Sequence, residues 1–357
     1  MAATDDGVWY ATREDVKQAL DVKGTARNNQ QIARALEDAS RSVEDLCHRR
    51  FYPLQATRYF DWPPREGTTP WVLRLDDSDL IAADQVTTGG RTLTPDEYNL
   101  EPANSGPPYT RIEANLGTNG SFGGGPTYQR DVQITGLWGY RNTEAPAGAL
   151  AATADDHQTS ITVDGPASAA VGVGSILRIG SERMLVTERA QVDTGQTVDG
   201  EGLTDRANSV LLPVQDGGVF AVGEVVLVDG ERLRVDDIAG SQLVVKRGWD
   251  GTVLAAHTPG AHVYASRALA VVRGALGTTP SAHTSGTPVA QWQPPGPVRQ
   301  LVIAEAINSL VSEAAGYARA QRSGEGSSER AVDTSALARR RDATYEACGR
   351  KGRVRAV

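Results

Sequence analysis

Helical spacing of apolar residues marks the first part of the chain. Val16, Ala19 and Leu20 follow Thr12 and two acidic residues, a pattern that predicts a short helix with a capped first turn. A longer helix is predicted from Asn28 or Asn29 onward. Its apolar positions form one stripe: Ile32, Ala35, Leu36, Ala39, Val43 and Leu46. Because several of these residues are small, we expect the helix to pack closely on a sheet or on another helix.

From Thr57 the apolar positions recur with a period of two, which predicts strands. The candidate strands are residues 57–62, 71–75, 85–87, 98–101, 110–113 and 132–140. Clusters of glycine and proline separate them and predict turns. Residues 1–150 are therefore expected to form two helices followed by a small antiparallel sheet.

Residues 151–292 consist of short strands rich in valine, leucine and isoleucine, and they contain internal repeats. Val173–Val186 matches Val222–Val235 at an offset of 49 residues (222 minus 173). Each copy carries a dipeptide suited to a two-residue hairpin turn. A second repeat relates Arg247–Gly260 to Arg273–Gly286 at an offset of 26 (273 minus 247). These repeats predict an all-β domain built from duplicated hairpins.

A run of prolines ends this region, and the residues after it are predicted to form a strongly amphipathic helix. Its apolar positions are Val298, Leu301, Val302, Ala304, Ala306, Ile307, Leu310 and Val311. We expect this helix to cover the sheet of the N-terminal part. A polar linker at 323–328 and a short basic helix at 335–347 follow.

The predicted fold class is α+β, with a helical domain that includes a small antiparallel sheet and a large inserted all-β domain of repeated hairpins. The expected boundaries are 1–150 for the N-terminal part, 151–292 for the insertion, 293–322 for the closing helix, and 323–357 for the linker and basic tail.

The composition predicts a folded, soluble protein, and the length predicts more than one hydrophobic core. It has 357 residues, 39% of them hydrophobic and 22% charged, with a mean hydropathy of -0.35. No apolar run approaches the roughly 18 residues of a membrane span, and the first ten residues do not resemble a signal peptide. We therefore expect a protein made and used in the cytoplasm. Cys47 and Cys348 are too few for a disulfide framework or a zinc cluster, so free buried thiols are expected.

Charge is unevenly distributed along the chain. The net charge is -8, but residues 339–357 hold seven Lys/Arg against two Asp/Glu, a local +5 that leaves -13 for the rest. Three interpretations of the basic tail stay open: a solvated end, a docking segment for an acidic partner, and a nucleic-acid contact. An acidic body binds duplex DNA poorly, because affinity depends on neutralised phosphates.

No residue pattern predicts catalysis, a cofactor site or a metal site. His257 and His283 occupy equivalent repeat positions, but no carboxylate or cysteine recurs with them at ligand spacing, so they are predicted to be structural turn residues. His48 is assigned to compensation of a helix dipole rather than to a nucleophilic pair with Cys47. The glycine-rich loop 120–125 lacks the ending of a phosphate-binding loop and is expected to be a flexible tip. Nucleophile-elbow and zinc-helix motifs do not occur in the sequence.

The order of these elements resembles the head-to-tail connector family of long-tailed bacteriophages. Tyr10–Leu20, Ile32–Arg50 and Pro297–Ala318 look like the family's helices, and Val132–Tyr140 with Pro146 after it looks like its terminal strand. The resemblance covers residues 8–146 and 294–320. The β insertion departs from the small connector, although its Arg-Gly-x-x-Gly-Thr-x-x-x-Ala-His motif is similar to a module that recurs in phage virion proteins.

This resemblance implies a structural virion protein, the head-to-tail adaptor, and not an enzyme. It implies a ring of roughly twelve copies at the neck of the virion, assembled in the host cytoplasm. The expected partners are the portal protein, the next neck protein (a stopper or tail-side connector) and genomic DNA that passes through the lumen without sequence-specific binding; no membrane is implied. Candidates for docking to the portal or within the ring are Leu301, Ile307, Leu310, Arg339, Arg340, Arg341, Arg350, Lys351, Arg353 and Arg355. The alternative is a tail-associated or host-surface binding protein that uses the β domain as its recognition module.

Overall fold

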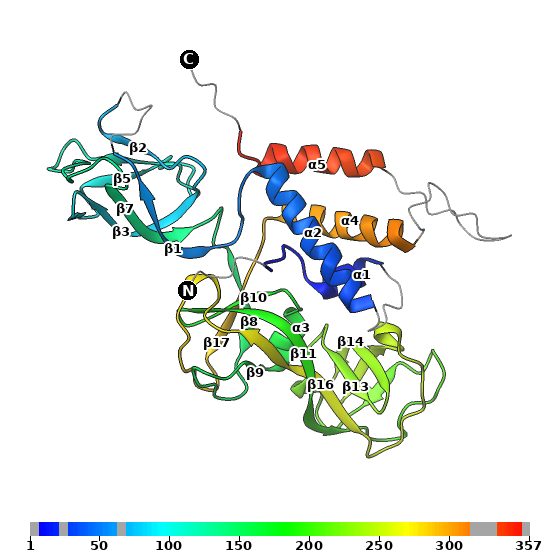
Figure 1. Ribbon diagram of the computed structural model, residues 1–357. Coiled ribbons are helices and arrows are strands. Elements are labelled where there is room, and N and C mark those ends of the chain that lie inside the picture. The colour runs from blue at the N-terminus through cyan, green and yellow to red at the C-terminus, as the bar shows by residue number, and fades with distance from the viewer. Residues whose placement is uncertain (1–6, 21–27, 63–68, 315–333, 352–357) are drawn as a thin grey trace. The chain divides into compact units, whose positions relative to one another are not determined.

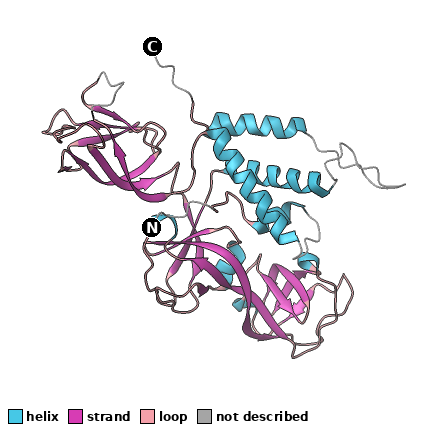
Figure 2. Ribbon diagram, viewed as in Figure 1, coloured by secondary structure: helices cyan, strands magenta, loops and turns pink. Residues whose placement is uncertain are grey.

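The computed structural model describes residues 7–20, 28–62, 69–314 and 334–351. It is a mixed α+β fold with a few helices and three antiparallel sheets (Figure 1, Figure 2), which confirms the expected class. The chain divides into two compact units. The first comprises Val43–Thr143 and Ala343–Val357, and the second comprises Ala2–Ser42 and Glu144–Asp342.

The first unit contains two small antiparallel sheets where the sequence pattern predicts strands. One sheet has the order β1-β7-β3-β4 and the other β2-β6-β5. The strands are β1 (Leu54–Phe60), β2 (Val72–Arg74), β3 (Leu80–Thr88), β4 (Arg91–Leu93), β5 (Tyr98–Glu101), β6 (Arg111–Ala114) and β7 (Val132–Trp138). Along β7, Val132, Ile134 and Trp138 are buried while Gln133 is exposed, so the period of two selects the face that forms the core. Residues of both sheets contribute to this core.

Four longer helices contribute to the second unit: α1 (Arg13–Leu20), α2 (Asn29–Cys47), α4 (Gly296–Ala314) and α5 (Thr334–Cys348). The last residues of α2 and α5, from Val43 and Ala343 onward, belong to the first unit. Helix α1 starts with a reciprocal cap: Thr12 Oγ1 accepts from the Asp15 N–H at 3.1 Å, and an Asp15 carboxylate oxygen accepts from the Thr12 N–H at 2.9 Å.

Helix α4 differs from the prediction in the distribution of its apolar residues. It contacts α1, and Arg299 Nη2 lies 2.6 Å from Asp15 Oδ1. Val298, Leu301, Val302 and Ala306 are buried, but the other apolar residues are only half-buried and lie around the helix rather than in one stripe. A helical domain closed by α4 over the N-terminal sheet is therefore not confirmed.

The second unit also contains a ten-stranded antiparallel sheet with the order β12-β15-β14-β13-β16-β11-β10-β17-β8, with β9 beside β16. Its strands are β8 (Glu144–Ala149), β9 (Ser160–Thr162), β10 (Ile176–Ile179), β11 (Glu182–Thr197), β12 (Leu211–Pro213), β13 (Val225–Val228), β14 (Glu231–Ala239), β15 (Gln242–Lys246), β16 (His262–Val272) and β17 (Pro288–Trp292). The short helix α3 (Gly165–Ala170) and the 3-10 turns η2 (Gly217–Val219), η3 (Trp249–Gly251) and η4 (Ala275–Gly277) connect them. The two hairpins predicted from the repeat are β10–β11 and β13–β14.

The duplication in this sheet is nested rather than tandem. In the hairpin β14–β15, Ala239 pairs with Gln242 around the turn Gly240-Ser241. At the repeat offsets these two residues correspond to Ala190 and Ala268, which also pair, in β11 and β16 (Figure 1). Residues 191–267 thus stand where the other copy has a two-residue turn. We call 191–267 the inner module, and residues 144–190 with 268–292 the outer module.

Each module has its own hydrophobic core. The outer core draws on residues between Ala147 and Val186 and between Leu269 and Val289, whereas the inner core lies between Val198 and Ala265. The pairing of β10 with β17 (Leu177 with Gln291) recurs as the pairing of β13 with β16 (Val226 with Ala265). Two complete copies of one β fold are therefore present, one inserted at a hairpin tip of the other.

Within the described ranges, no helix is both long and apolar enough to cross a bilayer.

Candidate functional site

Each β module contains a buried cluster of glutamate, arginine and histidine. The inner cluster is Glu231, Arg247 and His257, and the outer cluster is Glu182, Arg273 and His283. In the inner cluster, Arg247 Nε and Nη2 each lie 2.7 Å from a Glu231 oxygen, and His257 Nε2 lies 3.0 Å from Glu231 Oε2. The corresponding distances in the outer cluster are 2.7, 2.8 and 2.9 Å.

The loops that follow β15 and β16 fold back over the glutamates. Gly248 and Ala255 donate their backbone N–H groups to Glu231 at 2.8 and 2.9 Å, and Gly274 and Ser281 do the same to Glu182 at 2.9 and 3.1 Å. Gly248 and Gly274 have φ of 60° and 59°, the left-handed conformation that glycine adopts at little cost. The recurring Arg-Gly pair therefore supplies both the guanidinium and the sharp turn.

Both carboxylates are ionised and fully satisfied. Burial alone would raise the pKa of Glu182, but hydrogen bonds from Arg273, His283 and two backbone N–H groups outweigh it and lower the pKa to about 2. The same balance of burial against Arg247, His257 and the backbone lowers the pKa of Glu231 to about 2. Neither side chain exposes surface to solvent. The clusters are suited to closing a loop onto a hairpin.

The geometry of the outer cluster does not support nucleophilic catalysis. Ser281 Oγ lies 3.4 Å from His283 Nε2, the same ring nitrogen that lies 2.9 Å from Glu182. A relay requires the hydroxyl and the carboxylate on opposite ring nitrogens. The inner module has Ala255 at the position of Ser281.

The expectation that no carboxylate recurs with His257 and His283 is wrong. A glutamate accompanies each one, separated from it by 26 residues in the inner module and by 101 in the outer module. Ligand spacing along the sequence could not reveal this. The signal was present in another form, because a glutamate begins the second strand of both repeated hairpins.

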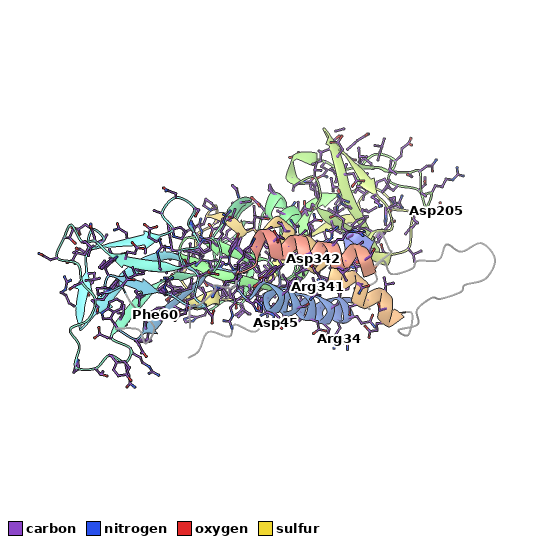
Figure 3. All side chains as sticks on the ribbon, turned by 90° about the horizontal axis from the view of Figure 1, so that it is seen from above. Arg34, Asp45, Phe60, Asp205, Arg341 and Asp342 are labelled. Carbon is purple, nitrogen blue, oxygen red and sulfur yellow. The ribbon has the colours of Figure 1, made fainter. Side chains whose placement is uncertain are left out.

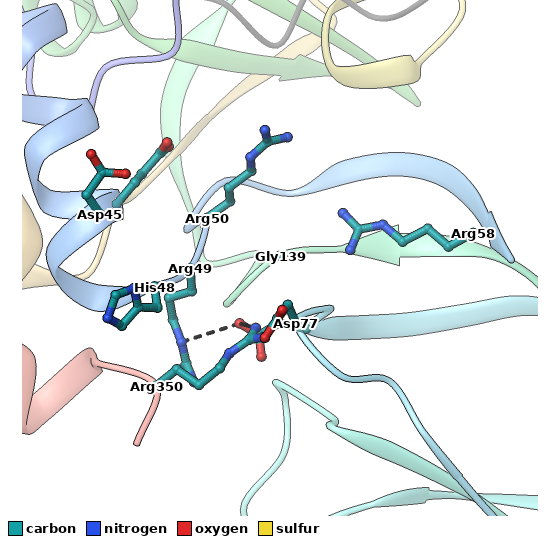
Figure 4. Close-up of a pocket in the computed structure, with 10 residues that line it drawn as sticks. Asp45, His48, Arg49, Arg50, Arg58, Asp77, Gly139 and Arg350 are labelled. Carbon is teal, nitrogen blue, oxygen red and sulfur yellow. Dashed lines mark hydrogen bonds and ion pairs between the residues drawn. The ribbon is translucent and has the colours of Figure 1, made fainter. Parts of the chain in front are cut away.

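A polar cavity of about 440 Å³ lies in the first unit (Figure 4). Its lining residues are Glu44, Asp45, His48, Arg49, Arg50, Arg58, Asp77, Asp79, Gly139 and Arg350. Asp79 is buried, and its Oδ2 lies 3.4 Å from Arg49 Nε and 3.0 Å from Arg350 Nη2. Arg350 also reaches Asp77 at 3.1 Å. Four arginines face four acidic residues, so the charges balance within the cavity.

His48 lines this cavity, and each cysteine is a sequence neighbour of a lining residue: Cys47 precedes His48, and Cys348 is two residues before Arg350. His48 directly follows α2 with φ of 52°, a conformation that ends a helix. Cys47 and Cys348 are free and buried, as expected. Burial, together with Cys348, raises the pKa of Cys47 to about 11, so this thiol is not a nucleophile at neutral pH.

The glycine-rich loop at 120–125 is packed rather than a flexible tip. Phe122 is buried, and its ring centroid lies 4.8 Å from that of Trp62. Gly123 donates its N–H to Thr88 Oγ1 at 2.7 Å. The glycines allow the backbone of this loop to approach Gly89, where an added Cβ would lie 2.6 Å from the Gly123 carbonyl.

Several predicted docking residues interact within their own chain. Leu301 is in the core, while Ile307 and Leu310 of α4 are half-buried. On α5, Arg341 (Figure 3) lies 2.7 Å from Glu305 and 3.4 Å from Ser42 Oγ, and Arg340 lies 3.1 Å from Gln300.

Arg339 and Lys351 are exposed. Arg339 contacts only its helix neighbour Ser335, at 3.4 Å, among the bonds recorded for it, and Lys351 lies 3.8 Å from Glu346. Arg353 and Arg355 lie outside the described residues. The basic tail is thus divided between arginines that bind this chain and residues that face solvent.

No protein-family model, curated protein or solved structure matches this chain. In the described part of the chain, no three histidine, cysteine or carboxylate side chains are grouped as they would be around a metal ion.

Proposed function

We propose that this protein is a structural virion subunit, the head-to-tail adaptor of a tailed bacteriophage. The observation that carries the proposal is the order of elements: a short helix, a longer helix, antiparallel strands that end in β7, and a proline-led helix near the end of the chain. This order is the basis of the resemblance to the connector family. The adaptor forms a ring of roughly twelve copies that binds the portal and the next neck protein.

An acidic subunit suits a ring that must pass DNA. The chain carries a net charge of -8, and residues 1–338 carry -13. A lumen lined by such subunits repels phosphates, whereas many close Lys/Arg contacts would hold the duplex. In this proposal genomic DNA slides through without sequence-specific binding.

The internal ion pairs of α5 narrow the choice of docking residues. Arg340, Arg341 and Arg350 hold α5 and the residues after it to their own chain. The remaining basic candidates are Arg339, Lys351 and the tail residues Arg353 and Arg355, and the half-buried Ile307 and Leu310 supply apolar surface. We propose that these residues contact the portal or a neighbouring subunit.

Electron microscopy of the isolated protein and co-sedimentation with portal-bearing heads test the proposal. Rings and association with heads are expected. The double variant R339E/K351E should lower the fraction bound to heads at least about fivefold, while R206E, an exposed charge reversal in the inner module, should not. A protein that forms no rings and does not sediment with heads would refute the adaptor.

The second candidate, a tail-associated or host-surface binding protein, is favoured by the nested β duplication, which the small connector lacks. Its discriminating measurement is retention of the full-length protein on host cells or on a glycan surface. Retention on cells together with no association with heads would favour this function over the adaptor.

A further inference from the structure

The nested duplication places two equivalent loops in different surroundings. The outer loop is Val171–Gly174 and the inner loop is Phe220–Gly223. Their backbones are alike: Gly174 donates to the Val186 carbonyl at 2.8 Å and Gly223 to the Val235 carbonyl at 2.7 Å. In each loop the next residue donates to the carbonyl three positions earlier, at 3.1 Å. The two loops can therefore be compared residue by residue.

The outer loop is covered by the segment from Trp9 to Glu14, in which Arg13 and Glu14 are the first residues of helix α1. The Arg13 N–H donates to the Val173 carbonyl at 3.1 Å, and the Val173 N–H donates to Glu14 Oε2 at 2.7 Å. The Trp9 ring lies against Gly174, where an added Cβ would be 2.6 Å from a ring carbon. Val173 is consequently only 4% exposed.

Among the segments that the structure describes, none covers the inner loop in this way. Val222, the equivalent of Val173, is 56% exposed. Among the described residues, no hydrogen bond is recorded for its N–H or its carbonyl. Gly223 has a φ of 92°, close to the 97° of Gly174, and an added Cβ there would meet only Ala169 Cβ, at 3.8 Å. The side chain, the N–H donor and the carbonyl acceptor of Val222 are therefore all accessible at one place on the surface.

We propose that the inner loop is a docking site for a segment of a partner protein that leads into the first turn of a helix. The occupant of the outer loop defines the chemistry: an aromatic ring against Gly223, a backbone N–H for the Val222 carbonyl, and a carboxylate for the Val222 N–H. The first N–H groups of a helix have no partner within the helix, which is why the Arg13 N–H can bind a loop carbonyl and why the first turn of a partner helix can do the same. The inference stands independently of the adaptor function.

One difference between the loops specifies the partner further. Gly172 of the outer loop is replaced by Ala221, and a Cβ at Gly172 would lie 2.4 Å from Glu14 Oε2 and 2.7 Å from Thr12 Cβ. Every residue except glycine has the Cβ that makes the 2.7 Å contact, so the partner segment has glycine at the position of Thr12. The carboxylate that corresponds to Glu14 is the far end of a flexible side chain and shifts away from the Ala221 methyl group. The Trp9–Glu14 segment of a second copy does not meet this requirement, and it is already bound to its own outer loop.

Peptides of residues 7–18 of this chain provide a probe, with fluorescence anisotropy on the full-length protein as the readout. The T12G peptide should bind the wild-type protein, and V222D should weaken that binding at least about tenfold, because it places a carboxylate against a carboxylate. A221G should let the unmodified peptide bind at least about tenfold more tightly than it binds wild type. The control V253D changes an exposed residue of the same module that is 81% accessible, and it should have no effect.

Two results would overturn the docking site. One is the absence of binding by both peptides to both the wild-type protein and A221G at millimolar concentration. The other is binding that V222D leaves unchanged, because the peptide would then occupy another surface or displace the segment on the outer loop. The expected result for A221G is tighter binding of the unmodified peptide. A loss of stability in the variant could not produce this result.

Discussion

Glu231 accepts hydrogen bonds from an arginine, a histidine and two backbone N–H groups while it exposes no surface. Such a group stabilises a fold only as long as all its partners remain, since a lone buried charge costs several kcal/mol. The cluster has a second copy around Glu182, so the same test can be made twice in one molecule.

Replacing the carboxylate by an amide leaves Arg247 buried without its counter-ion. We expect E231Q to lower the free energy of unfolding by about 3–5 kcal/mol, and E182Q by a similar amount. Urea unfolding followed by circular dichroism measures this change. The exposed Glu201 provides the control, because E201Q should change stability by less than about 0.5 kcal/mol. Equal effects of E231Q and E201Q would contradict the role assigned to the clusters.

The pH dependence of stability follows from the same residues. The pKa of Glu182 and Glu231 is about 2 in the folded protein and 4.5 in the absence of the fold. A lowered folded-state pKa means that the unfolded chain binds more protons, so the stabilisation is complete above about 4.5 and is lost as pH falls toward 2. Denaturation at pH 3 and at pH 6 should show a smaller loss of stability for E231Q than for the wild type. An identical loss in both proteins would argue against this coupling.

At the scale of elements, the insertion point of the inner module is defined by strand register. Ala190 pairs with Ala268 where the inner copy closes its own hairpin through Gly240-Ser241. Loop insertions cost little when their ends are close, which is why a complete module can replace a turn. Each module also keeps a separate core.

Joining Ala190 to Ala268 through Gly-Ser should leave the outer module folded, and residues 191–267 alone should also fold. Cooperative thermal unfolding and dispersed amide resonances are the expected results for both proteins. A matched variant joined through Gly-Ser one residue out of register, at Ala190 and Leu269, should be less stable, because it shifts every side chain of one strand to the opposite face. Equal stability of the two joins would contradict the nested register.

The position of helix α5 depends on an ion pair between Arg341 and Glu305. Arg341 lies 2.7 Å from Glu305, and burial raises the pKa of that glutamate despite the nearby arginine. We expect R341E to reduce protection of the α5 amides in hydrogen exchange and to lower stability by about 1 kcal/mol. R339E, on the exposed side of the same helix, should leave protection unchanged, and an equal effect of both would show that α5 is not held by this pair.

At the scale of the whole molecule, the net charge determines how strongly the chain binds duplex DNA. With a net charge of -8, the chain should not retain duplex DNA in a mobility-shift assay at about 150 mM salt, and lowering the salt should produce only weak binding through the basic tail. Removing residues 352–357 should weaken that residual binding, because the truncation takes away Arg353 and Arg355. Strong retention at physiological salt would contradict both the polarised charge distribution and the proposed sliding of DNA.

Local periodicity was sufficient to predict much of the secondary structure. The strands of the first unit other than β4, the hairpins β10–β11 and β13–β14, and helices α1 and α2 follow from apolar spacing and turn residues that act over a few positions. The free, buried cysteines were also predicted. These features depend on neighbours in sequence, so one chain without its structure contains the necessary signal.

Only the tertiary structure decided which repeated elements belong together. Glu182 pairs with Arg273 and not with Arg247, although Arg247 is nearer to it in the sequence. The reason is that the inner module is inserted between the two halves of the outer one. The same long-range closure groups α4 with α1 and leaves Val222 uncovered while Val173 is buried. Such contacts are selected by the free energy of whole cores, which periodicity along the sequence does not encode.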